Sequence, residues 1–137
     1  MSTYLDTSVL MSLLVEDANS SRAKRLTVDD VIVSDLTSAE FASALAIRFR
    51  RGSMSEDEVR AAHRLFDIWR RANAESVDVL SADLRRAEAI IRTLNHSLKT
   101  ADATHLAIAD RLGAALATFD TTMARESQRL GIALAPP

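Results

Sequence analysis

Short apolar runs alternate along the chain with longer stretches in which apolar residues recur every three or four positions. The short runs predict buried strands at about residues 2–5, 31–33, 77–80 and 114–118, with a last edge strand expected at 132–134. The longer stretches predict a helix that begins at residue 55 and further helices at about 7–15, 19–27, 38–51, 84–94, 102–112 and 121–130. Strands that alternate with helices indicate an α/β fold with a parallel sheet and right-handed crossovers.

Cap and turn residues support these boundaries. Ser55 is followed three residues later by Glu58, which is the spacing of a capping box. Gly52 and Gly113 each follow a predicted helix, where glycine commonly ends one. Because no linker-like stretch interrupts the pattern, we expect a single domain over residues 1–137.

Composition narrows the class of protein. The chain has no Cys, which excludes disulfides, a thiolate nucleophile and a Cys-ligated metal, and fits a cytoplasmic location. No apolar run approaches the ~18 residues of a membrane span, so we expect no membrane association. The net charge is −2, so any nucleic-acid surface must be a local basic patch.

Four carboxylates occupy positions where a strand would end or a helix begin: Asp6, Glu40, Asp102 and Asp120. In parallel α/β sheets, ligands bind at the carboxyl ends of the strands, and like charges gathered there need a cation. Helix capping explains each acid equally well, since Asp is a preferred N-cap and the segment 37–40 has the form of a capping box. The residues alone leave a metal site and ordinary capping both open.

Four segments carry a resemblance to a known family. The run Tyr4–Leu10 resembles the opening motif of PIN-domain nucleases, and later matches are Leu36–Glu40, Thr100–Ala107 and Thr118–Asp120. Their order and spacing are similar to those of VapC toxins from bacterial toxin–antitoxin modules. The resemblance implies a PIN-like three-layer α/β/α fold, whose central, mainly parallel sheet has four to five short strands flanked by helices.

The reaction that the resemblance implies is metal-dependent cleavage of RNA phosphodiester bonds. Mg²⁺ or Mn²⁺ would be the cofactor, since both prefer oxygen ligands. We expect Asp6 and Asp120 nearest to the metal, Asp102 completing the cluster, and Glu40 assisting with water or a second ion. Three hydroxyl residues are expected to orient the acids, with helix capping as the open alternative: Thr7, Ser8 and Thr118. We interpret His105 as a packed structural residue.

The same resemblance implies partners. A VapB-like antitoxin would neutralise the toxin, the chain would form a homodimer, and transfer or ribosomal RNA would be the substrate. We expect the antitoxin to occupy an apolar groove lined by Phe41, Leu45, Phe49, Phe66 and Trp69. RNA phosphates could meet Arg48, Arg50 and Arg51, although cations at a helix end also complement its dipole. The alternative function is a non-catalytic PIN-like module that binds RNA or protein.

Overall fold

Four parallel strands form the centre of the molecule in the part that this computed structural model describes, residues 1–15, 18–26 and 29–136. Their order across the sheet is β3-β2-β1-β4, and their bounds are β1 Thr3–Leu5, β2 Val31–Ser34, β3 Ala74–Val77 and β4 Ala115–Ala117. The helices are α1 Thr7–Leu14, α2 Ser20–Lys24, α3 Asp35–Arg50, α4 Glu56–Asn73, α5 Ser81–Arg92, α6 Thr100–Leu112 and α7 Thr121–Arg129.

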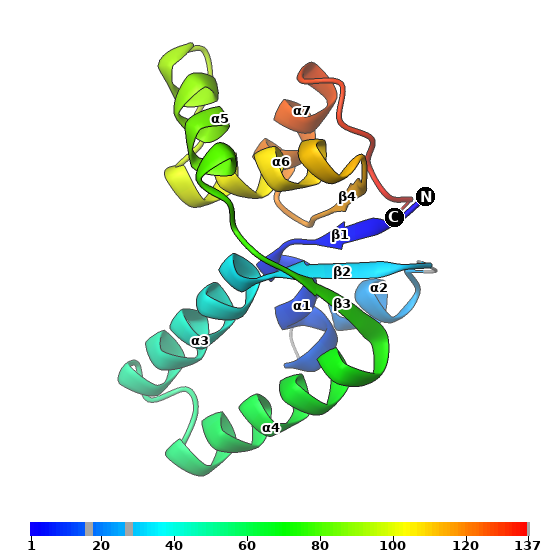
Figure 1. Ribbon diagram of the computed structural model, residues 1–137. Coiled ribbons are helices and arrows are strands. Elements are labelled where there is room, and N and C mark those ends of the chain that lie inside the picture. Colours follow the sequence, from blue (N-terminus) through cyan, green and yellow to red (C-terminus); the bar gives the residue numbers. More distant parts are fainter. Residues whose placement is uncertain (16–17, 27–28, 137) are drawn as a thin grey trace.

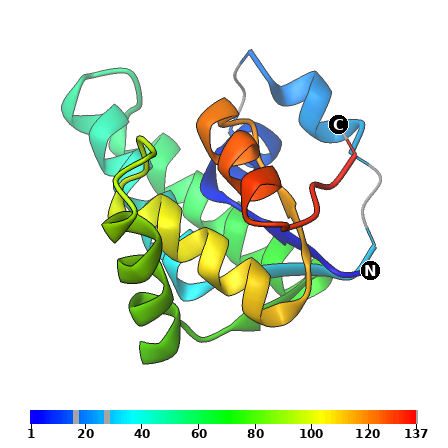
Figure 2. The same cartoon turned by 90° about the horizontal axis from the view of Figure 1, so that it is seen from above.

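Helices cover both faces of this sheet (Figure 1). Successive strand residues point to opposite faces, so alternate positions join different cores. On one face, Tyr4 and Leu116 pack with α5, α6 and α7. On the other, Leu5 and Val33 pack beneath α1, and α1, α3 and α4 share a further core. Figure 2 shows the sheet from above, with α5 and α6 packed against each other. The predicted three-layer α/β/α fold is therefore confirmed.

The start of α3 differs from the expectation. The helix begins at Asp35 rather than at residue 38, because the Ser34 hydroxyl accepts a hydrogen bond from the Thr37 amide at 3.3 Å and caps it. Thr37 lies inside the helix, where its hydroxyl donates to the carbonyl of Leu5 at 3.2 Å. The predicted capping box at 37–40 is therefore wrong, whereas the one formed by Ser55 and Glu58 is confirmed.

Other boundaries also shift. β3 covers Ala74–Val77 instead of 77–80, because α4 runs directly into it; Val77 and Val79 still pack on the core. α2 is shorter than predicted and α6 begins at Thr100, while expected helical residue 27 lies outside the described residues. The expected strand at 132–134 is reduced to a single bridge between Leu134 and Leu116. None of the described helices has both the length and the apolar character needed to cross a membrane.

Two ion pairs join α5 and α6 among the described residues, an exposed one between Arg86 and Asp110 at 3.8 Å and a shorter one that involves the buried Asp83. Arg111 on α6 donates from Nε and a terminal nitrogen to the carboxylate of Asp83 on α5, at 2.7 and 3.0 Å. Asp83 is buried, and it also accepts from the Leu80 amide. Burial raises the pKa of Asp83, but these hydrogen bonds outweigh it and hold the pKa below its usual value.

We expect Arg111→Met to lower the free energy of unfolding by about 2 kcal/mol at neutral pH, because hydrogen bonds to charged groups are worth roughly 1.5–3 kcal/mol. The folded pKa of Asp83 is depressed, so its contribution is present above the unfolded value and is lost as pH falls through the folded one. Urea unfolding measured at neutral pH and below pH 3.8 should therefore show the difference shrinking in acid. Arg60→Met, at the exposed Arg60–Glu56 pair, is the matched control. Equal losses in both variants would contradict this account.

Candidate active site

Asp6 directly follows β1 and caps α1. Its Oδ1 accepts from the Val9 amide at 3.1 Å and from the Ser8 hydroxyl at 2.6 Å. Its Oδ2 accepts from the Thr118 hydroxyl at 2.5 Å. The residue is only 3% exposed, and burial raises the pKa of Asp6 despite these hydrogen bonds. The capping interpretation of Asp6 is therefore confirmed, and two predicted hydroxyl residues hold its carboxylate.

The loop after β4 brings Asp120 to the same edge of the sheet. β4 lies next to β1, and the Asp120 amide donates to the Thr118 hydroxyl at 3.0 Å. The Phe119 amide donates to the Ser8 hydroxyl at 3.0 Å, which ties the two loops together. Asp120 caps α7 through Oδ1, and no hydrogen bond from the described residues reaches its Oδ2. One carboxylate oxygen of Asp120 can therefore serve another partner.

Glu40 approaches from the second turn of α3. Its Oε1 accepts from the Thr7 hydroxyl at 2.9 Å and is bonded to Nε2 of His105. Burial raises the pKa of Glu40, but the His105 and Thr7 bonds outweigh it, so the pKa lies below its ordinary value. Glu40 is thus an anion at neutral pH, held by α1 on one side and α6 on the other.

His105 has a contact that the sequence did not indicate. It is buried, as the structural interpretation predicted, but its ring joins Glu40 to the core. Nδ1 lies 2.6 Å from the Tyr4 hydroxyl, which is 2.7 Å from that of Ser34. Burial raises the pKa of Tyr4 to about 12, so Tyr4 stays a neutral phenol. The only sign of this contact in the sequence was a histidine within the largely apolar segment 103–109.

Asp102 lies in the first turn of α6, one turn before His105. Its carboxylate accepts from the Lys99 amide at 3.2 Å, which completes the turn as a capping acid does. Among the described residues it forms no hydrogen bond to the other three acids. Hydrogen bonds thus link Asp6 with the Asp120 loop and hold Glu40 beside α1. Among the described residues, Asp102 is connected to these acids only through α6, which also carries His105.

The carboxylate oxygens at this edge of the sheet suit a divalent ion. The described residues include no group of three or more Asp, Glu or His side chains already gathered around one point. Mg²⁺ does not require one, because it usually keeps several waters and takes only one or two carboxylates. Asp120 Oδ2, Glu40 Oε2 and Asp102 Oδ1 accept no hydrogen bond from the described residues. Such oxygens are the ligands that Mg²⁺ and Mn²⁺ prefer, so the residues fit the ion.

The predicted phosphate-binding arginines lie far along α3 from Glu40. With a rise of 1.5 Å per residue, Arg48, Arg50 and Arg51 are about 12–16 Å away along the helix axis. They end the helix on the side away from the sheet (Figure 1). Any contact with RNA would therefore be remote from the acids.

The predicted apolar groove is only partly open. Phe41, Leu45 and Phe66 are core residues, and the Phe41 and Phe66 rings lie 4.8 Å apart, so including these three as groove lining was wrong. They are buried because α1 closes over α3 and α4. Trp69 is half-buried. Phe49 remains 50% exposed. Two further apolar residues are exposed on α4 and were not part of the predicted groove, Leu65 at 47% and Ile68 at 65% exposure.

Comparison with known proteins agrees with this architecture. The PIN domain family matches residues 3–127. Ribonuclease VapC3 of Pyrobaculum aerophilum is 30% identical over 118 residues, which cover 85% of this chain and 87% of the relative. Crystal structures with the same fold include VapC20 of Mycobacterium tuberculosis, a sarcin-ricin loop cleaving toxin, with 24% identity, TM-score 0.73 and coverage of 91% and 95%. Another is VapBC2 of Rickettsia felis bound to a DNA fragment from its promoter, with 14% identity, TM-score 0.70 and coverage of 98% and 97%. The chain belongs to the PIN-domain family, with a VapC ribonuclease among its relatives in sequence.

Proposed function

We propose that this chain is a metal-dependent endoribonuclease of the VapC type. The observation that carries the proposal is the joining of Asp6, the Asp120 loop and Glu40 at the carboxyl edge of one parallel sheet. The relationship to Ribonuclease VapC3 over most of both chains supports it.

Asp6, through the lone pair of Oδ2 that the Thr118 bond leaves unused, and Asp120, through Oδ2, would hold the ion, with Glu40 and Asp102 at its periphery. A divalent ion there would offset the charge of the phosphate and lower the pKa of water. Ser8 and Thr118 fix the orientation of Asp6. His105 and Thr7 hold Oε1 of Glu40, which leaves Oε2 to accept the proton of the attacking water.

We further propose a VapB-like antitoxin as partner and a homodimer as the assembly. The antitoxin would cover the exposed apolar surface of α3 and α4 around Phe49, Leu65 and Ile68. Leu65 also lines a hollow of about 320 Å³, together with apolar residues that include Leu14 and Met54. Transfer RNA or ribosomal RNA is the proposed substrate; VapC20 is named for cleaving the sarcin-ricin loop. Both RNAs lie in the cytoplasm, which is the location we propose for the chain.

Induced expression in a bacterial host tests this function. We expect the chain to arrest growth and to generate RNA fragments with defined ends, and Asp120→Asn to do neither, since it removes the charge but keeps the capping oxygen of α7. Asp110→Asn, an exposed acid on α6, is the matched control and should arrest growth like the wild type. Growth arrest by Asp120→Asn as strong as the wild type's would contradict the proposed site.

A further inference from the structure

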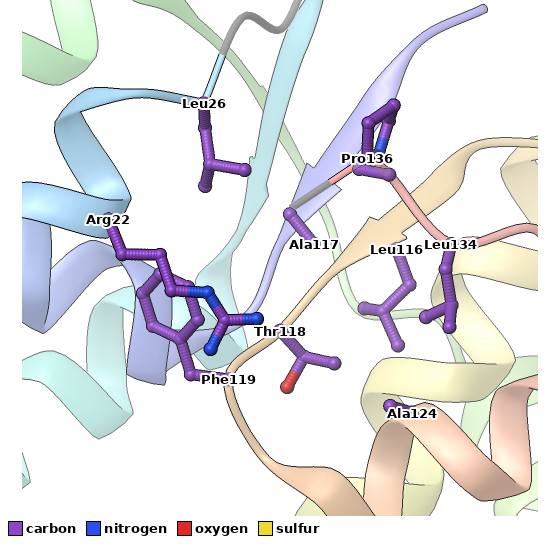
Figure 3. Close-up of a pocket in the computed structure, with 10 residues that line it drawn as sticks. Arg22, Leu26, Leu116, Ala117, Thr118, Phe119, Ala124, Leu134 and Pro136 are labelled. Carbon is purple, nitrogen blue, oxygen red and sulfur yellow. The ribbon is translucent and has the colours of Figure 1, made fainter. Parts of the chain in front are cut away.

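A pocket of about 360 Å³ lies between α2, the end of β4 and the C-terminal segment, and its lining includes Thr118, which donates to Asp6. Its walls are mainly apolar and include Leu26, Ala117, Ala124 and Leu134 (Figure 3). The volume is at the lower end of the range in which proteins bind small ligands. The pocket is therefore suited to one small, largely apolar group.

One side of this pocket is an aromatic ring covered by a cation. The guanidinium carbon of Arg22 lies 4.8 Å from the centroid of the Phe119 ring, and Figure 3 shows the two side chains next to each other in the pocket wall. Arg22 is exposed, and no acidic side chain of the described residues forms an ion pair with it. Aromatic rings and guanidinium planes are the surfaces on which proteins stack unpaired nucleic-acid bases.

The same wall is fixed to the proposed active site. Phe119 stands between Thr118, which donates to Asp6, and Asp120. Its amide donates to Ser8, which also donates to Asp6. A group lodged against Phe119 therefore contacts a residue that precedes Asp120 in the chain and lies one hydrogen-bonded residue, Ser8 or Thr118, away from Asp6.

Charge favours a nucleic acid over a protein segment as the occupant. α2 contains no acidic residue, and it carries Arg22 and Lys24, with Arg25 directly after it. In a chain whose net charge is −2, these three exposed cations lie within four residues of the sequence, and Arg22 itself lines the pocket. An RNA strand supplies both complements, because its phosphates are anionic and its bases have apolar faces.

We propose that this pocket binds one unstacked base of a single-stranded or looped RNA substrate, immediately beside the phosphodiester that is cut. The inference rests on the proposed ribonuclease function and adds to it which part of the substrate the protein recognises. Arg22 and Phe119 would determine substrate preference, while the acids carry out cleavage.

The test is steady-state cleavage of a single-stranded RNA oligonucleotide that spans a site mapped in total RNA. The same oligonucleotide is prepared with an abasic nucleotide on either side of the cut in turn. We expect one abasic substitution to lower kcat/KM of the wild type about tenfold, as base–aromatic stacking does elsewhere. Arg22→Gln and Phe119→Leu should lose about tenfold on the intact RNA and little more on the abasic one. Arg85→Gln, an exposed arginine on α5, is the matched control and should behave as the wild type does.

Each other outcome overturns the proposal. An abasic penalty as large in the two variants as in the wild type would mean that the pocket holds no base. Variants that cut normally but escape antitoxin inhibition would show that it binds protein. Cleavage that Asp6→Asn abolishes but Arg22→Gln does not affect would support the ribonuclease function and show that the pocket binds no base of the substrate. A wild type that cuts no RNA would contradict both the ribonuclease function and the base-binding pocket. Arg22 is exposed, so its variant carries the test if Phe119→Leu proves unstable in thermal unfolding.

Discussion

Asp6→Asn should lower the rate of RNA cleavage by about 100-fold or more while the protein stays folded. Residues that only support a metal ligand typically cost 10–100-fold when changed, and Asp6 is proposed as a ligand itself. Asparagine keeps the oxygen that caps α1 through the Val9 amide, and its amide group can donate to Thr118 in place of the present bond. Because burial disfavours the charged form of Asp6, which raises its pKa, removing the charge should not destabilise the fold.

The measurement compares initial cleavage rates and thermal unfolding of Asp6→Asn with the wild type and with Asp110→Asn. The control removes an exposed acid on α6 and should keep full activity. If Asp6→Asn unfolds at a much lower temperature, the main role of Asp6 is capping. Wild-type rates in a folded Asp6→Asn protein would exclude Asp6 from the reaction.

Glu40→Gln should have an effect at least as large, a loss of about 100- to 10,000-fold in kcat, which is the range of general acid–base contributions. Glutamine keeps an oxygen for the Thr7 hydroxyl and for His105, so α1, α3 and α6 remain joined. What is lost is the anion whose Oε2 would accept the proton of the attacking water. Rates measured with saturating RNA separate this effect from binding.

The dependence of the cleavage rate on pH is a second test of the role of Glu40. The pKa of Glu40 lies below the ordinary carboxyl value, whereas burial raises the pKa of Asp6. As the pH falls, the wild type should therefore lose activity first through protonation of Asp6 and then, at lower pH, through protonation of Glu40. The residual rate of Glu40→Gln should keep the first loss and lack the second. A folded variant with an unchanged rate and both losses of activity would contradict the role of Glu40.

The sequence predicted the features that local signals determine. The strand–helix order follows from spacing, and Asp6 and Asp120 lie directly after strands, so their shared edge of the sheet follows from topology. The start of α3 was missed because Ser34 and Thr37 are both acceptable caps three residues apart. Which of the two residues caps the helix depends on a contact between Thr37 and Leu5, 32 residues away. β3 was misplaced because Glu75 and Ser76 are exposed and its register is set by pairing with β2.

The contacts that join distant segments could not be read from the sequence. Glu40 and His105 are 65 residues apart, and Tyr4 and His105 are 101 apart. No local pattern connects such pairs; packing of α6 against the sheet brings them together. The same holds for Arg22 and Phe119, which meet only because α2 lies beside the end of β4. Burial of Phe41 and Phe66 was likewise decided by α1, which a helical stripe does not reveal.

The most direct test of the central claim is cleavage of total bacterial RNA by the purified, antitoxin-free chain, with Mg²⁺ or Mn²⁺ and again with EDTA, beside Asp6→Asn. We predict discrete fragments that require the metal ion, return when it is restored after EDTA treatment, and are absent with Asp6→Asn. Cleavage that survives EDTA, or a folded wild type that binds RNA but cuts nothing with either metal, would contradict the account of a metal-dependent ribonuclease at the carboxyl edge of the sheet.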